Sequence, residues 1–149
     1  MAMARSVPSQ ESYSRYSVLE YLLIGDLRDL LDEFPDDETR RWLLAVIEEL
    51  LDLLPNEFEY EDQNGYLSEV CEQFPNWTPE VDRLHAERDE LYLKLLELHQ
   101  RLSDDQPFEY IAREIRPQLR RWIKRAQRHR ECEQDLVLSA CDLALGGEG

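Results

Sequence analysis

Five ionisable residues lie on otherwise apolar helical stripes, and they constrain the fold more than any other feature of this sequence. Three segments carry apolar residues at alternating intervals of three and four, the spacing of the inward face of a bundle helix. The ionisable residues at these inward positions are Glu57, Glu61, Arg88, His129 and Glu133. Because an unpaired buried charge is very costly, such groups persist in a core only if they pair with one another or hold a metal. The sequence therefore predicts a polar centre inside a helical core.

The inward positions can be followed along the chain. The first stripe comprises Leu43, Ile47, Leu50, Leu54, Glu57 and Glu61. The second comprises Val81, Leu84, Arg88, Leu91, Leu95, Leu98 and Leu102. The third comprises Phe108, Ala112, Ile115, Leu119, Trp122, Ala126, His129, Glu133, Leu136 and Ala140. A further inner face, expected near the N-terminus, comprises Leu19, Leu22, Leu23, Leu27, Leu30 and Leu31. Asp26 lies three residues after Leu23 and four before Leu30, which places it on that same face.

Length, glycine content and periodicity favour an all-α fold. The chain has 149 residues, enough for one domain, and only five glycines. Prolines and polar turns divide it into expected helices at 17–34, 36–62, 66–74, 78–102 and 107–145, with Thr78 as a helix cap. We expect an up-down-up-down four-helix bundle over residues 16–146, preceded by a disordered leader at residues 1–15.

Acidity and cysteine usage limit the expected partners and compartment. The net charge of −16 disfavours direct binding to nucleic acid or to an anionic membrane surface. No segment approaches the ~20 apolar residues that cross a bilayer. Cys71, Cys132 and Cys141 are odd in number and lack CxxC spacing, which argues against a disulfide framework or a zinc knuckle. We therefore expect a cytoplasmic protein.

Basic residues crowd one part of the last expected helix, where Glu114 is the only acidic residue from 113 to 130. They are Arg113, Arg116, Arg120, Arg121, Lys124, Arg125, Arg128 and Arg130. The favoured interpretation is that they pair with acidic residues of neighbouring helices. The alternative is a docking surface for an acidic partner.

The sequence carries no recognisable catalytic motif. It has no phosphate-cradling glycine loop, no HExxH metalloprotease motif, and no serine or cysteine in a recognisable catalytic order with histidine. A hydrolase built on the carboxylates of Glu57 and Glu133 is conceivable, but the sequence supplies no substrate cleft. We predict that the protein is not an enzyme and has no catalytic residues.

The residues of the polar centre also carry a resemblance to a known family. The stretches concerned are 54–61, 64–67, 79–91 and 129–133, which read LPNEFEYE, NGYL, PEVDRLHAERDEL and HRECE. In these stretches the chain resembles the hemerythrin-like (HHE cation-binding) family. The resemblance implies a four-helix bundle, and members of the family that carry or sense oxygen hold two irons with histidines and carboxylates.

The resemblance also assigns positions to a metal site. The HxxxE motif of the family's second helix falls on Glu57 and Glu61, so a glutamate replaces its histidine. A ligand histidine of the third helix falls on Arg88. The motif of the fourth helix is kept as His129 and Glu133.

Arg88 is the residue that distinguishes the possible functions. A guanidinium group does not ligate a metal at physiological pH and brings a permanent positive charge. We therefore expect a degenerate site without a cofactor, in which an ion-pair network of Glu57, Glu61, Arg88, His129 and Glu133 replaces the di-iron centre. Such a protein is expected to act as a regulatory or interaction module that binds an unknown protein partner or itself.

Two alternatives stay open. In the first, the protein holds iron or manganese and carries or senses oxygen, and the first-helix histidine of the family falls on Asp26. The candidate ligands are then Asp26, Glu57, Glu61, His129 and Glu133. In the second, Glu57 and Glu61 turn outward near the end of their helix, and the chain holds no polar centre.

Overall fold

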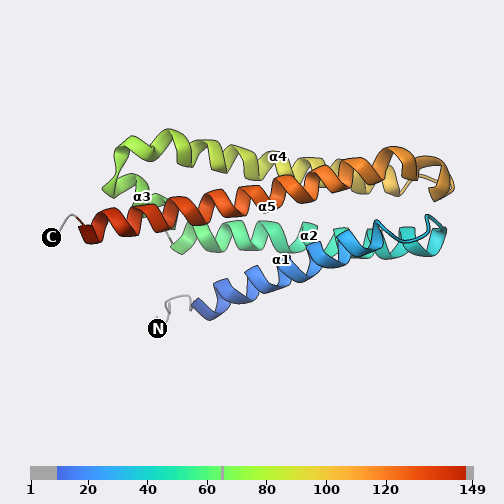
Figure 1. The fold of residues 1–149 in the computed structure, drawn as a ribbon, viewed down its shortest axis with the longest axis horizontal. Coiled ribbons are helices and arrows are strands. Elements are labelled where there is room, and N and C mark those ends of the chain that lie inside the picture. Colours follow the sequence, from blue (N-terminus) through green and yellow to red (C-terminus); the bar gives the residue numbers. More distant parts are fainter. Residues whose placement is uncertain (1–9, 65, 147–149) are drawn as a thin grey trace.

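The computed structural model describes residues 10–64 and 66–146, and Figure 1 shows an all-helical fold over these ranges. The elements are α1 (Gln10–Leu30), α2 (Asp37–Asn64), α3 (Tyr66–Gln73), the 3-10 turn η1 (Pro75–Trp77), α4 (Thr78–Leu102) and α5 (Phe108–Gly146). Within these ranges no strand forms, and no helix is both long and apolar enough to cross a membrane. The all-α class predicted from the apolar periodicity is confirmed.

The long helices α1, α2, α4 and α5 lie lengthwise beside one another (Figure 1). α2 turns back along α1, and α5 turns back along α4, so the members of each pair run antiparallel. α1 packs mainly on α2, α2 also packs on α4, and α4 packs on α5. The short α3 contacts α2, α4 and α5 near one end of the molecule.

The first helix differs from its predicted range. α1 begins at Gln10, earlier than expected, so residues 10–15 of the expected disordered leader are helical. Residues 1–9 of that leader lie outside the described part of the chain. The helix also ends sooner than expected, at Leu30.

Arginine side chains of α5 hold the chain that follows α1. The carbonyl oxygen of Leu31 accepts hydrogen bonds from Arg116 Nε at 3.2 Å and from Arg120 Nη2 at 3.0 Å. Arg116 Nη2 also donates to the carbonyl oxygen of Glu33 at 3.4 Å. These donors satisfy carbonyl groups at the end of the helix, which need partners once the helical hydrogen-bond ladder stops.

The starts of α2 and α4 are built differently. Before α2, the side chain of Asp36 accepts a hydrogen bond from the backbone N–H of Thr39 at 2.8 Å, and this bonding lowers the pKa of Asp36. The expected cap of α4 is wrong. Trp77 occupies the cap position without a side-chain hydrogen bond, and Thr78 is already the first helical residue.

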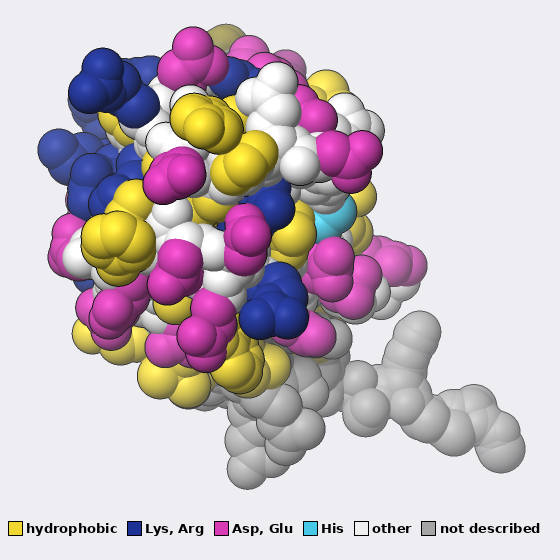
Figure 2. All heavy atoms as spheres, turned by 90° about the vertical axis from the view of Figure 1, so that its right-hand side faces the viewer, with side chains coloured by type: hydrophobic (Ala, Val, Ile, Leu, Met, Phe, Trp, Pro, Cys, Tyr) yellow, Lys and Arg dark blue, Asp and Glu magenta, His cyan; other side chains and the backbone are white. Residues whose placement is uncertain are grey.

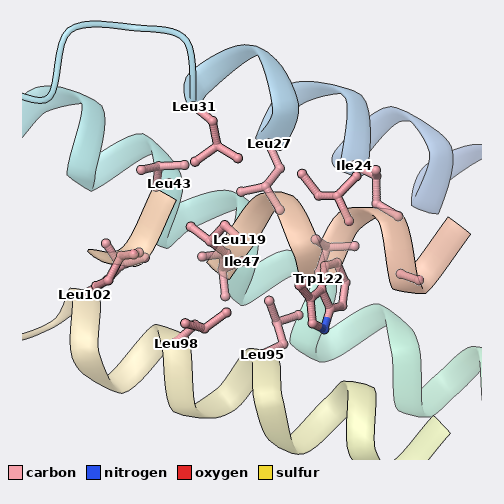
Figure 3. Packing of buried hydrophobic residues seen from close by; sticks show 14 of the residues in the cluster. Ile24, Leu27, Leu31, Leu43, Ile47, Leu95, Leu98, Leu102, Leu119 and Trp122 are labelled. Atoms are coloured by element: carbon pink, nitrogen blue, oxygen red, sulfur yellow. The ribbon is translucent and has the colours of Figure 1, made fainter. Parts of the chain in front are cut away.

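Apolar side chains from the four long helices form one main core. Figure 3 shows Leu27, Ile47, Leu98, Leu119 and Trp122 converging from these helices. The indole Nε1 of Trp122 donates to the backbone oxygen of Leu91 at 2.8 Å, so its polar atom is satisfied although the ring is buried. A second, smaller cluster lies under α3 and contains Leu67, Val70 and Val81.

The buried face of α1 is rotated from the expected one. Leu19 and Leu22, predicted to point inward, are 42% and 53% exposed. The buried stripe instead comprises Glu20, Ile24, Leu27 and Leu31. Asp26 is exposed because it lies one residue before Leu27, and each residue turns the side chain by about 100° around a helix.

Candidate functional site

A group of charged side chains is buried between the two apolar clusters. Glu57, Glu61, Arg88, His129 and Glu133 are between 0% and 6% exposed. They come from α2, α4 and α5, and each continues an apolar stripe of its own helix. Because their helices face one another, the charged groups meet inside the protein and do not reach water.

Arg88 joins α4 to both neighbouring helices. Its guanidinium group pairs closely with Glu61 of α2, and lies 3.2 Å from Glu133 of α5. A third carboxylate, from Asp62, accepts a hydrogen bond from Nη1 at 2.9 Å. The guanidinium carbon also lies 5.0 Å from the centroid of the Phe58 ring. Burial opposes the charge, but the carboxylates of Glu133 and Glu61 outweigh it and raise the pKa of Arg88.

Arg130 is a second arginine at this site, and the sequence analysis did not assign it a role there. It pairs closely with Glu57 of α2 and with Glu20 of α1, and its Nη1 donates to Glu61 at 3.1 Å. Glu20 is 8% exposed and was also missed. We call the set Glu20, Glu57, Glu61, Arg88, His129, Arg130 and Glu133 the buried network.

His129 lies between two carboxylates. Its Nδ1 is hydrogen-bonded to Glu87 at 2.6 Å, and its Nε2 lies against Glu133, four residues on in α5. Burial disfavours the imidazolium, but the contacts with Glu133 and Glu87 outweigh it and raise the pKa of His129. Burial likewise opposes ionisation of Glu133. Its hydrogen bond to His129 and the charge of Arg88 prevail, and lower the pKa of Glu133 to about 2.

The acidic members of the network outnumber the basic ones, and burial raises the pKa of two of the carboxyl groups. Four carboxyl groups, those of Glu20, Glu57, Glu61 and Glu133, lie beside the two arginines and His129, whose pKa is raised. Burial and the nearby charge of Glu133 raise the pKa of Glu61 to about 9, against the attraction of Arg88. Burial also raises the pKa of Glu20, so desolvation favours proton uptake by this carboxylate-rich network.

Asp26, the remaining candidate ligand, lies outside this site. Its side chain is exposed on α1, so it does not approach the carboxylates of α2 or α5. Cys71 and Cys132 are free thiols, whereas the side chain of Cys141 lies outside the described part of the chain. The structure thus joins four of the five proposed ligands and leaves the fifth at the surface.

The arrangement does not fit a di-iron or manganese centre. Across residues 10–64 and 66–146, no three His, Cys, Asp or Glu side chains are placed to hold one metal ion. Arg88 donates hydrogen bonds to Glu61 and Glu133, and one oxygen of Glu57 lies against Arg130; guanidinium groups do not ligate metals. In this geometry the guanidinium groups of Arg88 and Arg130 lie among the buried carboxylates.

The other basic residues of α5 divide into two groups. Arg116 and Arg120 bind the end of α1, and Arg120 also pairs with Asp32 at 2.9 Å. Arg125 pairs with Glu90 and lies 3.5 Å from Glu87. The favoured interpretation, pairing with acidic residues of neighbouring helices, therefore holds for Arg125 and for Arg130 of the buried network, whereas Arg116 binds backbone carbonyl oxygens and Arg120 pairs with an acid that follows α1. It does not hold for Arg113, Arg121, Lys124 and Arg128, which are exposed and have no ion pair with a described residue.

Comparison with known proteins assigns the chain to no family. No protein-family model, no curated protein and no solved structure matches it. The resemblance to hemerythrin-like proteins stays a prediction, and the function has to be argued from the buried network and the surface.

Proposed function

We propose that this protein is a hemerythrin-like, up-down-up-down four-helix bundle in which the buried network replaces the metal site, and that it is a non-enzymatic regulatory or protein-interaction module. The position of Arg88 carries the proposal. It stands where the resemblance places a ligand histidine, and it pairs with Glu61 and Glu133. Two guanidinium groups and one imidazolium supply the positive charge that metal ions supply in working sites of the family.

The packing of the helices supports the bundle. Each long helix packs on the next along the chain, and α1 also touches α5, as expected when four helices enclose one core. The buried stripe of each long helix faces inward, and the charged positions of the network continue these inward faces. Iron sites of four-helix bundles lie in such an interior, between facing helices.

The burial of the network supports a role without catalysis. Its four carboxylates are at most 8% exposed, so a substrate has no direct access to them. A module of this kind acts through its outer surface, on another protein or on a second copy of itself. The free thiols of Cys71 and Cys132 favour a reducing, cytoplasmic location, and the net charge of −16 disfavours nucleic acid and anionic membranes as partners.

The alternative is a protein that holds iron or manganese and carries or senses oxygen. Binding would require both Arg88 and Arg130 to leave the carboxylates that they contact. It would also require deprotonation of Glu61, whose pKa is raised. Both changes cost free energy and so disfavour metal binding. We therefore place this function second.

Metal analysis with an absorption spectrum tests the proposal. The protein is purified without chelator from cells supplied with iron and manganese. We expect a colourless, metal-free and fully folded protein. Stoichiometric iron with oxo-bridge absorption would overturn the proposal and favour oxygen carriage or sensing.

A variant that restores the family pattern provides the matched comparison. Glu57→His together with Arg88→His returns a histidine to both positions where the resemblance expects one. We expect this double variant to bind Co²⁺ and show its visible absorption bands, while the wild-type chain shows none. If the double variant folds but does not bind Co²⁺, the assigned ligand positions are wrong. That result would not contradict the ion pairs of the wild-type chain.

A further inference from the structure

Four cations form a row along the outer face of α5. Arg113, Arg121, Lys124 and Arg128 are all exposed. At about 100° per residue they fall within one face of the helix, and at 1.5 Å per residue they extend over roughly 22 Å. Figure 2 shows Lys and Arg side chains gathered on one side of the molecule, at the upper left of that view. We call these four residues the basic row.

The basic row lies in a strongly acidic chain, in which Asp and Glu outnumber Lys and Arg by 33 to 17. Even so, no member of the row forms an ion pair or hydrogen bond with a described residue. Glu114, next to Arg113, pairs with Arg101 of α4 at 2.9 Å, and Glu131, three residues after Arg128, is exposed and does not pair with it. Ion pairs within the described chain therefore do not explain why these four cations lie on one face of α5.

A hollow between α4 and α5 adjoins the basic row. It has a volume of about 550 Å³, and Arg121 belongs to both its wall and the row. Leu93, which is 61% exposed, supplies apolar surface to this hollow, and the buried Trp122 also lines it. The two acids of its wall are already paired, Glu90 with Arg125 and Glu97 with Lys94. The hollow thus combines apolar surface with the unpaired charge of Arg121.

We propose that the basic row and this hollow bind an acidic segment of another protein, with one apolar side chain of the segment seated against Leu93. Charge complementarity supplies the attraction along the row, and the apolar contact determines where the segment docks. The inference deepens the proposed role as an interaction module and rests on it. It adds the chemical class of the partner and the surface that recognises it.

A short protein segment fits this surface better than an extended polyanion. At physiological ionic strength, charges interact over about 8 Å, so a segment that follows the row meets mainly its four cations. A nucleic-acid duplex or a bilayer extends beyond the row and meets the acidic remainder of a chain with net charge −16. The exposed apolar side chain of Leu93 also suits a protein side chain rather than a phosphate backbone.

The test is a binding titration of the full chain with a defined probe. The probe is a fluorescently labelled synthetic helix of about 16 residues with glutamates along one face and a central leucine, long enough to follow the row. We expect saturable binding in an anisotropy assay at about 50 mM salt, and about tenfold weaker binding at about 300 mM salt. Lack of saturable binding at the lower salt concentration overturns the proposal.

Matched variants locate the site. Arg121→Gln with Lys124→Gln should weaken binding about tenfold. Arg28→Gln with Arg41→Gln removes the same charge from exposed arginines outside the row and should change binding less than about twofold. Equal weakening by the two pairs overturns the assignment of the site, because net charge alone would then explain the binding.

Two further measurements separate the partner classes. Leu93→Ala should weaken binding about fivefold. This ratio should be the same at low and high salt, because the lost contact is apolar. Duplex DNA and vesicles containing phosphatidylserine are titrated in parallel. If either binds more tightly than the peptide and loses binding with the Arg121 and Lys124 variant, a protein segment is the wrong partner. That result would leave metal analysis of the proposed relic site unaffected.

Discussion

Replacing Arg88 with leucine removes the cation that connects α4 to α2 and α5. The side chain of Arg88 is 4% exposed and contacts the carboxylates of Glu61, Glu133 and Asp62. Asp62 is 59% exposed and can return to water. Glu61 and Glu133 stay buried, so the variant leaves them without one of their counter-charges.

The contacts that persist set the size of the expected loss. Removing one partner of a buried ion pair typically costs about 3–5 kcal/mol. Glu61 retains Arg130 at 3.1 Å, and Glu133 retains His129, so neither carboxylate loses every partner. Burial of the apolar leucine side chain offsets a further part of the lost stability. We therefore expect Arg88→Leu to lower the free energy of unfolding by about 3 kcal/mol at neutral pH, the low end of that range.

Urea unfolding followed by circular dichroism measures this loss, and a second variant identifies its cause. Arg88→Leu combined with Glu61→Leu removes a carboxylate together with its cation. We expect the double variant to lie within about 1 kcal/mol of the wild-type chain, because replacing both partners of a buried pair is often neutral. If the double variant is no more stable than Arg88→Leu alone, or if Arg88→Leu unfolds at the wild-type midpoint, the reasoning fails.

The same substitution on the surface of α4 is the matched control. Among the described residues Arg83 pairs with Glu80 alone, one turn earlier, and its side chain is 53% exposed. Arg83→Leu makes the same chemical change on the same helix without uncovering a buried carboxylate. Its unfolding midpoint should stay close to the wild-type value.

Two other predictions concern the protonation of the network and the apolar core. The raised pKa values of Glu61 and His129 give stability that is complete below their ordinary pKa values and is lost as pH rises through the raised ones. For Glu61, whose pKa is raised to about 9, the unfolding free energy should therefore fall between pH 7 and 9 by at most about 1.4 kcal/mol per pH unit. Glu61→Gln, which keeps a neutral side chain, should flatten this profile in urea titrations at the two pH values, and an equally steep profile would show that Glu61 is not the group involved. Trp122→Phe should cost about 1–2 kcal/mol, because it removes the bond to Leu91 and some buried volume. Trp42→Phe, at a side chain 58% exposed, is its control in thermal unfolding, and equal losses would mean that burial of Trp122 contributes nothing.

Helical periodicity was sufficient to find most of the buried network. Glu57, Arg88 and Glu133 occupy inward positions because flanking apolar residues determine which face of each helix is buried. Glu20 had the same signal, since it precedes Ile24 at the spacing of an inward stripe. The signal was obscured because the residues around Glu20 are nearly all apolar, so more than one face of α1 looked suitable for burial.

Other features depend on how far a side chain extends and on how a helix is rotated about its axis, and a periodic pattern specifies neither. Arg130 lies beside the stripe of α5 and is half-buried, yet its long side chain extends its charge to Glu20 and Glu57. Asp26 was placed on the wrong face because the rotation of α1 depends on its packing against α2. The division of the α5 cations into paired and unpaired groups depends likewise on where the neighbouring helices lie.

The two arginines of the network together connect all four long helices. Arg88 of α4 contacts Glu61 of α2 and Glu133 of α5, whereas Arg130 of α5 contacts Glu20 of α1 as well as α2. Leucine stripes alone allow one helix to slide along another by a turn and still bury apolar surface. With the network present, such a slide of about 5.4 Å separates buried charges from their partners, which costs several kcal/mol for each broken pair. The charged centre therefore favours one register of the four helices, a role that it can perform without a metal.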